Sequence, residues 1–480
     1  MQQLTGLDSA FLAMETRTVY GHVGSVCIVD PSTAPEPVTL ERICKVIQSR
    51  LPLVPAFRRR LVEVPLGLDF PYWIDDPDFD IEFHVRELAL TAPGNARQLK
   101  EQVARLHARP LDRTRPLWEI YLILGLEGGR AAIYTKVHHS AIDGVSGNEI
   151  LAAVLDLSPE GRDISGAEPF LPERPPGPLG LLALSAFSLP RNPVRAVRVS
   201  AGLLRAAPTL LWTSAPRLPV VNRLVHRDSG ALLPRQPGLR APHTPFNAPI
   251  TQHRRWAFCD VSLDAVKAVK NAVGVTVNDV VLALAAGILR RWLLDHEALP
   301  DGPLIAAVPV SVRTEAEKGT LGNKVSAMLT VLPTNLADPL DRLHAAHEAT
   351  RVAKEQHGAI PAGLLADVTQ FAMPALAGQA ARLSARLRLV ERVSLFNLII
   401  SNVPGPNVPL YYAGAELLAY YPLSAIADGQ GLNITVLSYR GTVFFGLLAC
   451  RELVPDLDHM AESIGDEMRD LRQAAGTAAD

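Results

Sequence analysis

Cysteine is scarce in this chain. Its 480 residues include four cysteines, and no two of them form a Cys-x-x-Cys pair. Scattered thiols of this kind argue against a disulfide framework and against a structural zinc site. They favour a reducing compartment, and we expect no metal centre. The four positions are Cys27, Cys44, Cys259 and Cys450.

Long apolar runs are also missing. No stretch approaches the roughly 18 to 20 uninterrupted apolar residues that a membrane-spanning helix needs. The first residues carry no basic region followed by an apolar segment, so we do not expect a secretory signal. The sequence therefore predicts a cytoplasmic protein. Peripheral contact with the inner membrane face or with lipid droplets stays open as an alternative.

Charge of one sign is not in excess. The chain has 47 basic and 49 acidic residues and a net charge of −2, so its overall charge gives no support to a nucleic-acid partner. Hydrophobic residues make up 48% and charged residues 20%, which excludes a disordered chain and allows large buried cores. A chain of this length is expected to form two domains of about 200 residues or a little more.

The composition changes between residues 172 and 240. Proline and arginine recur there, lysine is absent, and apolar blocks lie between the prolines. We interpret this segment as an inter-domain connection with short helices bounded by proline. It divides the chain into an N-terminal domain (1–171) and a C-terminal domain (241–480). Arginine beside leucine, phenylalanine and tryptophan suits either a solvated linker or an element on a membrane surface.

Strand-like and helix-like segments alternate in both halves, which predicts an α/β fold. In the first half, the apolar segments 118–124 and 131–135 flank a Glu-Gly-Gly turn and predict a β-hairpin. In the second half, residues 280–292 have the apolar spacing of a helix. We expect strands at 304–312, 326–332, 395–400, 432–437 and 442–447, and helices at 341–355, at 361 to about 392, and from 457 onward.

Two adjacent histidines follow the predicted hairpin. His138 and His139 stand in the pattern His-His-x-x-x-Asp-Gly, which ends at Asp143 and Gly144, and a helical pattern begins at residue 145. Rigid scaffolds often present catalytic groups on such strand-to-helix turns. An imidazole has an unperturbed pKa close to neutrality, so it can take a proton from a hydroxyl at ordinary pH. One of these histidines is therefore the leading candidate for a general base.

Four other stretches accompany the histidine motif: Leu4-Thr5-Gly6-Leu7-Asp8, Pro110-Leu111-Asp112-Arg113-Thr114-Arg115-Pro116-Leu117-Trp118-Glu119, Asn278-Asp279-Val280-Val281-Leu282-Ala283 and Ser401-Asn402-Val403-Pro404-Gly405-Pro406. Together with that motif, they resemble the bacterial wax ester synthase/diacylglycerol acyltransferase family. That family lies within the superfamily of acyltransferases and condensation domains that includes chloramphenicol acetyltransferase. The resemblance implies two chloramphenicol acetyltransferase-like domains that form a pseudo-dimer with a central channel.

The resemblance also implies roles for the motif residues. The second histidine, His139, would be the general base, and His138 would support the turn. Asp143 could orient the imidazole or hold the turn, and the resemblance favours the structural role, with Arg313 as a plausible partner. Gly144 is expected where the backbone needs a conformation or a close approach that a Cβ would block.

The other motifs have both structural and functional interpretations. Asn278 and Asp279 suit the N-terminus of a helix, where their side chains bind free amides, while the resemblance places them near the active site. Ser401 and Asn402 are expected in a loop that is either a plain turn or part of the substrate channel. Pro116-Leu117-Trp118 is expected to be a packing motif at the start of a strand.

The resemblance implies an acyl-CoA-dependent O-acyltransferase that makes triacylglycerol from diacylglycerol, and also wax esters from long-chain alcohols. Acyl-CoA is a substrate, and no cofactor is expected. Ser140 follows His139 but has no Gly-x-Ser-x-Gly elbow around it, so direct transfer without an acyl-enzyme is expected. Two alternatives remain: an acyltransferase or condensation enzyme that uses a carrier-protein thioester, and a non-catalytic lipid-binding protein.

Overall fold

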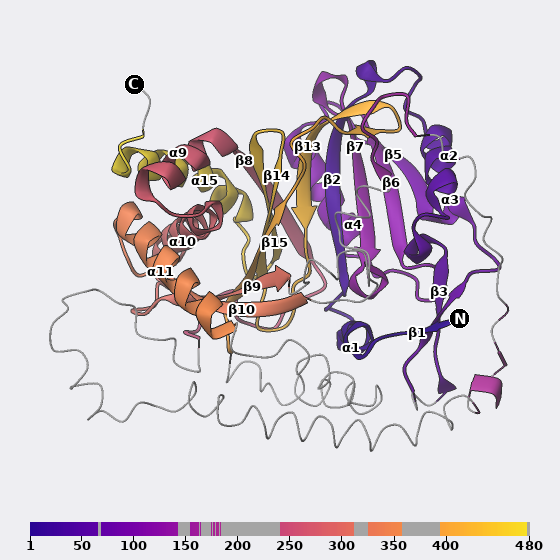
Figure 1. Cartoon of the computed structure of the whole chain (residues 1–480), viewed down its shortest axis with the longest axis horizontal. Helices are drawn as coiled ribbons and strands as arrows, with labels where there is room; N and C mark the ends of the chain where they lie inside the picture. Colours follow the sequence, from indigo (N-terminus) through magenta and orange to yellow (C-terminus); the bar gives the residue numbers. More distant parts are fainter. Residues whose placement is uncertain are drawn as a thin grey trace.

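The computed structural model describes residues 1–65, 69–142, 154–162, 241–311, 325–357 and 394–477, with a few isolated positions between 164 and 183. The described residues form two α/β units side by side, each built on a six-stranded sheet (Figure 1). One cluster of buried apolar side chains contains the N-terminal sheet and also reaches residues of the C-terminal sheet, among them Trp256, Phe444 and Leu448. A second cluster joins the C-terminal sheet to its helices. The α/β prediction is confirmed.

The N-terminal sheet has the strand order β12-β13-β2-β7-β6-β5. Its hairpin β6–β7 is the one predicted from the sequence, because the two strands pair antiparallel around a turn with a positive φ at Gly128. The bounds are β2 (His22–Asp30), β5 (Val85–Ala89), β6 (Trp118–Leu124), β7 (Ala131–His138), β12 (Tyr411–Tyr412) and β13 (Ala415–Leu423).

Among the described N-terminal residues, four α-helices and a small sheet accompany these strands. Helix α2 begins after Thr39, whose side chain accepts the Arg42 N–H as a typical N-cap does. Helix α4 begins with a capping box between Asn95 and Gln98. The bounds are α1 (Gly6–Met14), α2 (Leu40–Arg50), α3 (Ile81–His84) and α4 (Ala96–His107), with β1 (Gln2–Gln3), β3 (Arg59–Val62) and β4 (Tyr72–Asp75) in the small sheet.

The C-terminal sheet has the order β10-β9-β11-β14-β15-β8 and carries its helices together on one side (Figure 1). Helix α10 is the central helix of this layer, and most of its side chains are buried. The strands are β8 (Arg254–Ser262), β9 (Leu304–Ser311), β10 (Val325–Leu332), β11 (Leu398–Pro404), β14 (Leu432–Tyr439) and β15 (Thr442–Cys450). The helices are α9 (Leu263–Val273), α10 (Val277–Asp295), α11 (Pro339–His357) and α15 (Leu457–Ala474). The helix predicted from residue 361 to about 392 lies outside the described residues.

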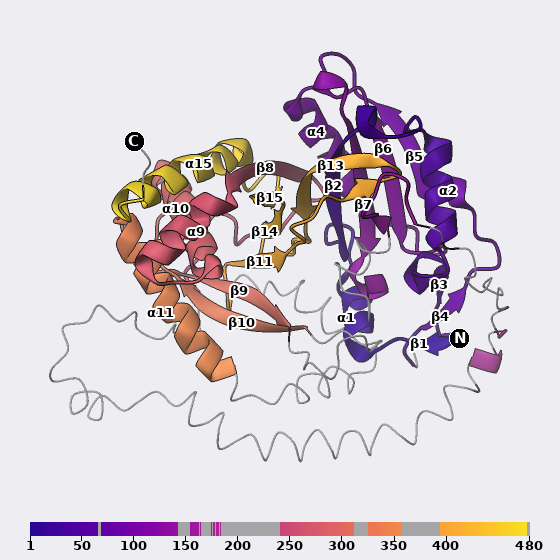
Figure 2. The same ribbon diagram turned by 45° about the horizontal axis from the view of Figure 1, so that its top comes forward.

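The two units share a strand. Strand β13 comes from the second half of the chain, yet it pairs antiparallel with β2 in the N-terminal sheet, and Figure 2 shows it crossing to that sheet. Tyr421 at its end packs against Phe258 and Phe444 of the C-terminal sheet. The crossing therefore ties the unit that carries the histidines to the C-terminal strands.

The prediction of a loop at Ser401 and Asn402 is wrong. Both residues lie within β11, which pairs parallel with β14, with Ser401 opposite Thr435 and Asn402 opposite Val436. Pro404 ends the strand, where a missing N–H costs least. The proline and glycine that suggested a loop mark the end of this strand.

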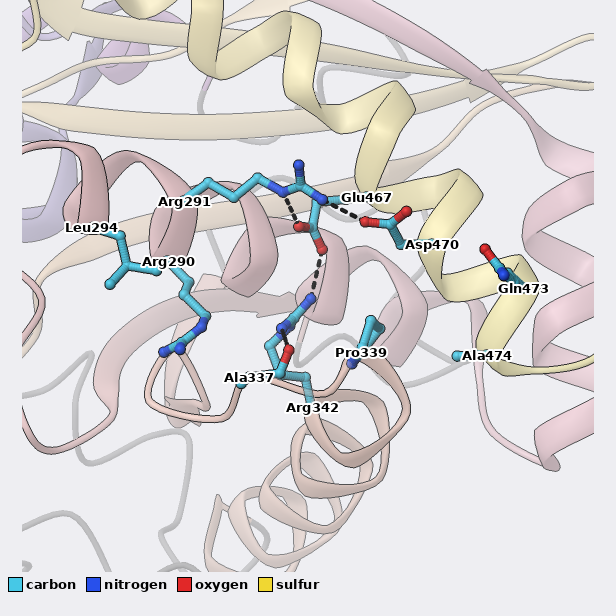
Figure 3. Close-up of a pocket in the computed structure, with 10 residues that line it drawn as sticks. All are labelled: Arg290, Arg291, Leu294, Ala337, Pro339, Arg342, Glu467, Asp470, Gln473 and Ala474. Atoms are coloured by element: carbon cyan, nitrogen blue, oxygen red, sulfur yellow. Dashed lines mark hydrogen bonds and ion pairs between the residues drawn. The ribbon is translucent and has the colours of Figure 1, made fainter.

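A hollow of about 510 Å³ lies on the helical side of the C-terminal unit, between α10, α15 and the start of α11 (Figure 3). Its wall contains a charge network in which the Glu467 carboxylate binds Arg342 at 2.6 Å and also binds Arg291. Arg291 in turn contacts Asp470 at 2.5 Å. A Cβ at Gly287 would collide with Glu467, so α10 and α15 approach closely here. We interpret this network as a packing device, and Ser401, Asn402 and the histidines are not in its lining.

Among the described helices, none alone has the length and apolarity to cross a bilayer. Helices α9 and α10 meet that test only when taken together, and they are bent by 104°.

Candidate active site

The histidine turn is held from two sides. Strand β7 ends at His138, and a 3-10 turn begins at His139. The His138 N–H donates to the Leu117 carbonyl at 2.9 Å, and the His139 N–H donates to the Gly21 carbonyl at 2.8 Å. Leu117 belongs to the Pro-Leu-Trp stretch, and the next residue, Trp118, is fully buried at the start of β6. The predicted packing role of that stretch is confirmed.

His138 is buried, and each of its ring nitrogens has a polar neighbour. Its Nδ1 accepts the Ser140 N–H at 3.1 Å and lies 2.6 Å from Ser140 Oγ. An acceptor at Nδ1 assigns the proton of the neutral ring to Nε2. Nε2 lies 3.1 Å from Glu15 Oε1, close enough for charge attraction although the N–H is not well aligned. His138 therefore supports the turn.

Glu15 is a charged anchor beside His138. Its carboxylate accepts the Gly21 N–H at 2.8 Å and two bonds from Arg113, at 2.6 and 3.1 Å. Burial alone would raise the pKa of Glu15, but the His138 ring, the Gly21 amide and Arg113 together lower it to about 2. Glu15 is therefore ionised at neutral pH and holds three parts of the site together.

His139 is placed differently. Its ring is stacked on Phe11 of α1, with centroids 4.2 Å apart and planes 17° apart. It is partly exposed, unlike His138. Desolvation is the main reason that its pKa is lowered to about 4, and repulsion by His138 acts in the same direction. The imidazole is consequently neutral at pH 7, which is the form a general base requires.

The depressed pKa predicts the pH dependence of any reaction that uses His139 as the base. The acid limb of kcat/KM reports the free enzyme's base, so activity should fall as pH drops through about 4 rather than through the usual histidine value near 6.5. A kcat/KM profile from pH 3.5 to 8 checks this. An acid limb centred near 6.5 would show that the base is not this imidazole.

Gly21 has little room for a side chain. A Cβ placed on it would lie 2.5 Å from His138 Nε2, and its carbonyl and amide bind His139 and Glu15. Replacing Gly21 by alanine should therefore displace the turn and lower kcat about 100-fold, the order expected for a misplacement near 1 Å. Steady-state kinetics checks this, with Gly302→Ala as a control, since nothing lies within 4 Å of a Cβ at Gly302. Wild-type kcat in Gly21→Ala would contradict the assigned role.

Asp279 has the structural role expected from its position. It forms a capping box with Thr276 at the start of α10 and accepts a bond from His347 Nδ1 at 2.8 Å. Burial tends to raise its pKa, but the bonds from His347 and Thr276 lower it. The neighbouring Asn278 Oδ1 lies 3.5 Å from Asn402 Nδ2. The structure thus brings the Asn-Asp stretch to the strand that carries Ser401 and Asn402.

Three predicted residues, Asp143, Gly144 and Arg313, lie outside the described residues. Ser140 is described: it is buried and its hydroxyl contacts His138 Nδ1. A nucleophile must reach the substrate, so this placement agrees with a supporting role for Ser140.

The sequence analysis did not single out Phe11, Glu15, Gly21 or Arg113 as site residues. All four act through contacts between distant parts of the chain, since about 100 residues separate Glu15 from Arg113. Two signals pointed toward them: Arg113 lies within a family stretch, and Phe11 and Glu15 follow another one. Neither signal indicates a contact with the histidines.

The geometry defines a class of protein: two α/β units with a partly exposed, neutral histidine on a turn that a second histidine and a carboxylate support. A solved wax ester synthase/diacylglycerol acyltransferase from Marinobacter aquaeolei VT8 is similar over 99% of this chain and 100% of its own, with 30% identity and a TM-score of 0.68. The first condensation domain of the calcium-dependent antibiotic synthetase has the same fold, with 18% identity, a TM-score of 0.57 and coverage of 100% and 98%. The prediction of two chloramphenicol acetyltransferase-like units is confirmed.

The chain belongs to the wax ester synthase/diacylglycerol acyltransferase family. The model of that family's catalytic domain matches residues 4–281, and the model of its C-terminal domain matches residues 321–472. A probable diacylglycerol O-acyltransferase of Mycobacterium tuberculosis is 37% identical over 98% of this chain and 98% of its own length.

Proposed function

We propose that the protein is an acyl-CoA-dependent O-acyltransferase that esterifies diacylglycerol to triacylglycerol and also accepts long-chain alcohols. The observation that carries this proposal is the arrangement of the two histidines. His138 is buried, with Nδ1 bonded to the Ser140 amide and Nε2 3.1 Å from Glu15 Oε1, whereas His139 is partly exposed and its Nδ1 has no hydrogen-bond partner among the described residues. The family membership supplies the substrate class.

The reaction follows from the neutral imidazole of His139. It accepts the hydroxyl proton of the alcohol as the oxygen attacks the thioester carbonyl. The new C–O bond forms an ester, the C–S bond breaks, and the imidazolium returns its proton to the CoA thiolate. The proton balance closes within one cycle, and in this mechanism the acyl group passes directly from thioester to alcohol.

The surrounding residues keep that imidazole in place. Phe11 packs against the ring face and limits its rotation, and the Gly21 carbonyl fixes the backbone of His139. The ionised Glu15 attracts the N–H face of His138 and so supports the preceding residue. Positioning of this kind lowers the barrier because the reacting atoms meet in the right geometry.

The two substrates suggest how they enter the protein and where in the cell it acts. We infer that acyl-CoA and the alcohol enter a channel between the two units from opposite sides, with Asn278, Ser401 and Asn402 along it. Diacylglycerol resides in membranes, so a cytoplasmic protein with peripheral contact to the inner membrane or to lipid droplets fits this acceptor.

Two other functions make different predictions. A condensation-type enzyme would take its acyl group from a carrier protein and would be inactive with free acyl-CoA. A non-catalytic lipid-binding protein would float with lipid but release no CoA. The lipid-binding protein would not require the neutral, partly exposed imidazole of His139, whereas the condensation-type enzyme would differ in its acyl donor.

A product assay tests the proposal. Purified protein is incubated with palmitoyl-CoA and either dipalmitoylglycerol or hexadecanol in detergent or lipid, and CoA release and lipid products are followed. Triacylglycerol or wax ester should accumulate, and the two arms identify the acceptor. Absence of product with both alcohols would overturn the proposal.

A further inference from the structure

Arg254 is a buried arginine that bonds to backbone carbonyls. It lies at the start of β8 and is 6% exposed. Its guanidinium donates to the Thr251 carbonyl at 2.6 Å and the His253 carbonyl at 3.2 Å, and it reaches the Thr18 carbonyl in the N-terminal unit. Within the described part of the chain, it forms no ion pair with a carboxylate. Burying a charge of this kind is costly, which calls for a structural reason.

The segment that Arg254 reaches is the one that holds the histidines. Residues 15–21 form a compact loop between α1 and β2. The Thr16 N–H donates to the Val19 carbonyl at 3.0 Å, and the Val19 N–H donates to Thr16 Oγ1 at 3.1 Å. The loop's ends are joined by the Gly21 N–H and Glu15. These end residues contact His139 and His138, so a shift of the loop shifts both histidines.

A second path leads from Arg254 to the same turn. Its guanidinium carbon lies 5.0 Å from the centre of the Tyr20 ring, a cation–π distance. Tyr20 is stacked on His22 with ring centres 5.5 Å apart, and His22 is opposite His138 in the β2–β7 ladder. The arginine therefore contacts the loop at two places: the backbone carbonyl of Thr18 and the aromatic ring of Tyr20.

We propose that Arg254 is a positioning residue through which the C-terminal unit holds the histidine turn of the N-terminal unit. Its planar fork can bind carbonyls of both units at once, which a lysine ammonium cannot reproduce with the same geometry. This proposal rests on the proposed acyltransfer function. It adds that the base is positioned by the C-terminal unit as well as by its own strand.

A second contact between the units provides a matched control. Lys100 of α4 pairs with Asp458 of α15 and lies 5.6 Å from the Phe258 ring, yet it does not contact residues 15–21. If Arg254 only held the two units together, removal of Lys100 would have the same kinetic effect. If Arg254 acts through the loop, the two variants differ.

The test compares Arg254→Met, Arg254→Lys and Lys100→Met by steady-state kinetics with palmitoyl-CoA and the acceptor that the product assay identifies. We expect Arg254→Met to lower kcat about 10- to 100-fold with KM within about two-fold, because positioning acts on the chemical step. Arg254→Lys should recover part of that loss, and Lys100→Met should keep wild-type kcat.

A double-mutant cycle with Glu15→Gln identifies the route. Both residues act on one loop, so their losses in kcat should not multiply. The kcat of the double variant should lie within about three-fold of the kcat of the less active single variant. Multiplicative losses, equal losses in Arg254→Met and Lys100→Met, or unchanged kcat in Arg254→Met would each overturn the proposal. If Arg254→Met does not fold, Arg254→Lys replaces it in the same double-mutant cycle. An inactive wild-type protein would instead contradict the proposed function.

Discussion

Replacing His139 with alanine is expected to reduce turnover about 10²- to 10⁴-fold, the usual contribution of a positioned general base. Without the imidazole, no described group at the turn can take the proton of the alcohol, because His138 Nδ1 already accepts the Ser140 amide and its Nε2 faces Glu15. The thioester would still bind, so the loss should appear in kcat more than in KM.

Two comparisons make this result specific. His459→Ala removes an exposed imidazole from α15 and should leave kcat unchanged. Melting curves of both variants should match the wild-type curve within a few degrees, since His139 is partly exposed and its ring is not part of the buried apolar core. If His139→Ala retains more than about a tenth of wild-type kcat, another group must serve as the base.

Replacing Glu467 with alanine is expected to destabilise the C-terminal unit by about 3 to 5 kcal/mol, the cost of breaking a buried ion pair from one side. Glu467 and Arg342 are 5% and 4% exposed, so the change leaves the arginine charge buried without its carboxylate. Arg291 loses one of its two acidic partners as well.

Urea unfolding followed by circular dichroism checks this prediction. Asp470→Ala is the matched control on the same helix, because Asp470 is 50% exposed and also contacts Arg291. A half-exposed ion pair contributes about 1 kcal/mol or less, so the control should shift the transition only slightly. Equal shifts for the two variants would contradict a buried role for Glu467.

Local patterns predicted much of the fold. The apolar segments that form β6 and β7 and the glycines between them predict a hairpin, and the structure has that hairpin with the histidines at its end. Thr39 is likewise of a residue type that often begins a helix, and α2 begins after it. Signals of this kind lie within a few residues of the element that they determine, so a single sequence contains them.

Features that depend on distant residues were not predictable. Strand β13 belongs by sequence to the second half, but it completes the N-terminal sheet because β2 offers it a partner. Ser401 and Asn402 look like loop residues because proline and glycine follow them. In the structure they belong to β11, because both residues pair with β14. In the site, the sequence predicted His139, whereas Glu15 and Phe11 become site residues only after α1 packs against the turn.

The domain boundaries remain a prediction, and they too depend on contacts between distant parts of the chain. A cut at residue 240 would remove β12 and β13 from the sheet that carries the histidines. We therefore expect residues 1–240 alone to be incomplete as a catalytic unit. The contact from Arg254 to Thr18 leads to the same expectation.

The central claim is that His139 acts as the base while the acyl group passes directly from CoA to the alcohol. Whether CoA release depends on the alcohol tests this claim most directly. A rapid-quench experiment mixes the protein with palmitoyl-CoA, with and without the preferred alcohol, and measures free CoA in the first turnover. Direct transfer predicts no CoA release without the alcohol, and equal amounts of CoA and ester when it is present. A burst of CoA equal to the enzyme concentration in the absence of alcohol would indicate an acyl-enzyme and contradict the account.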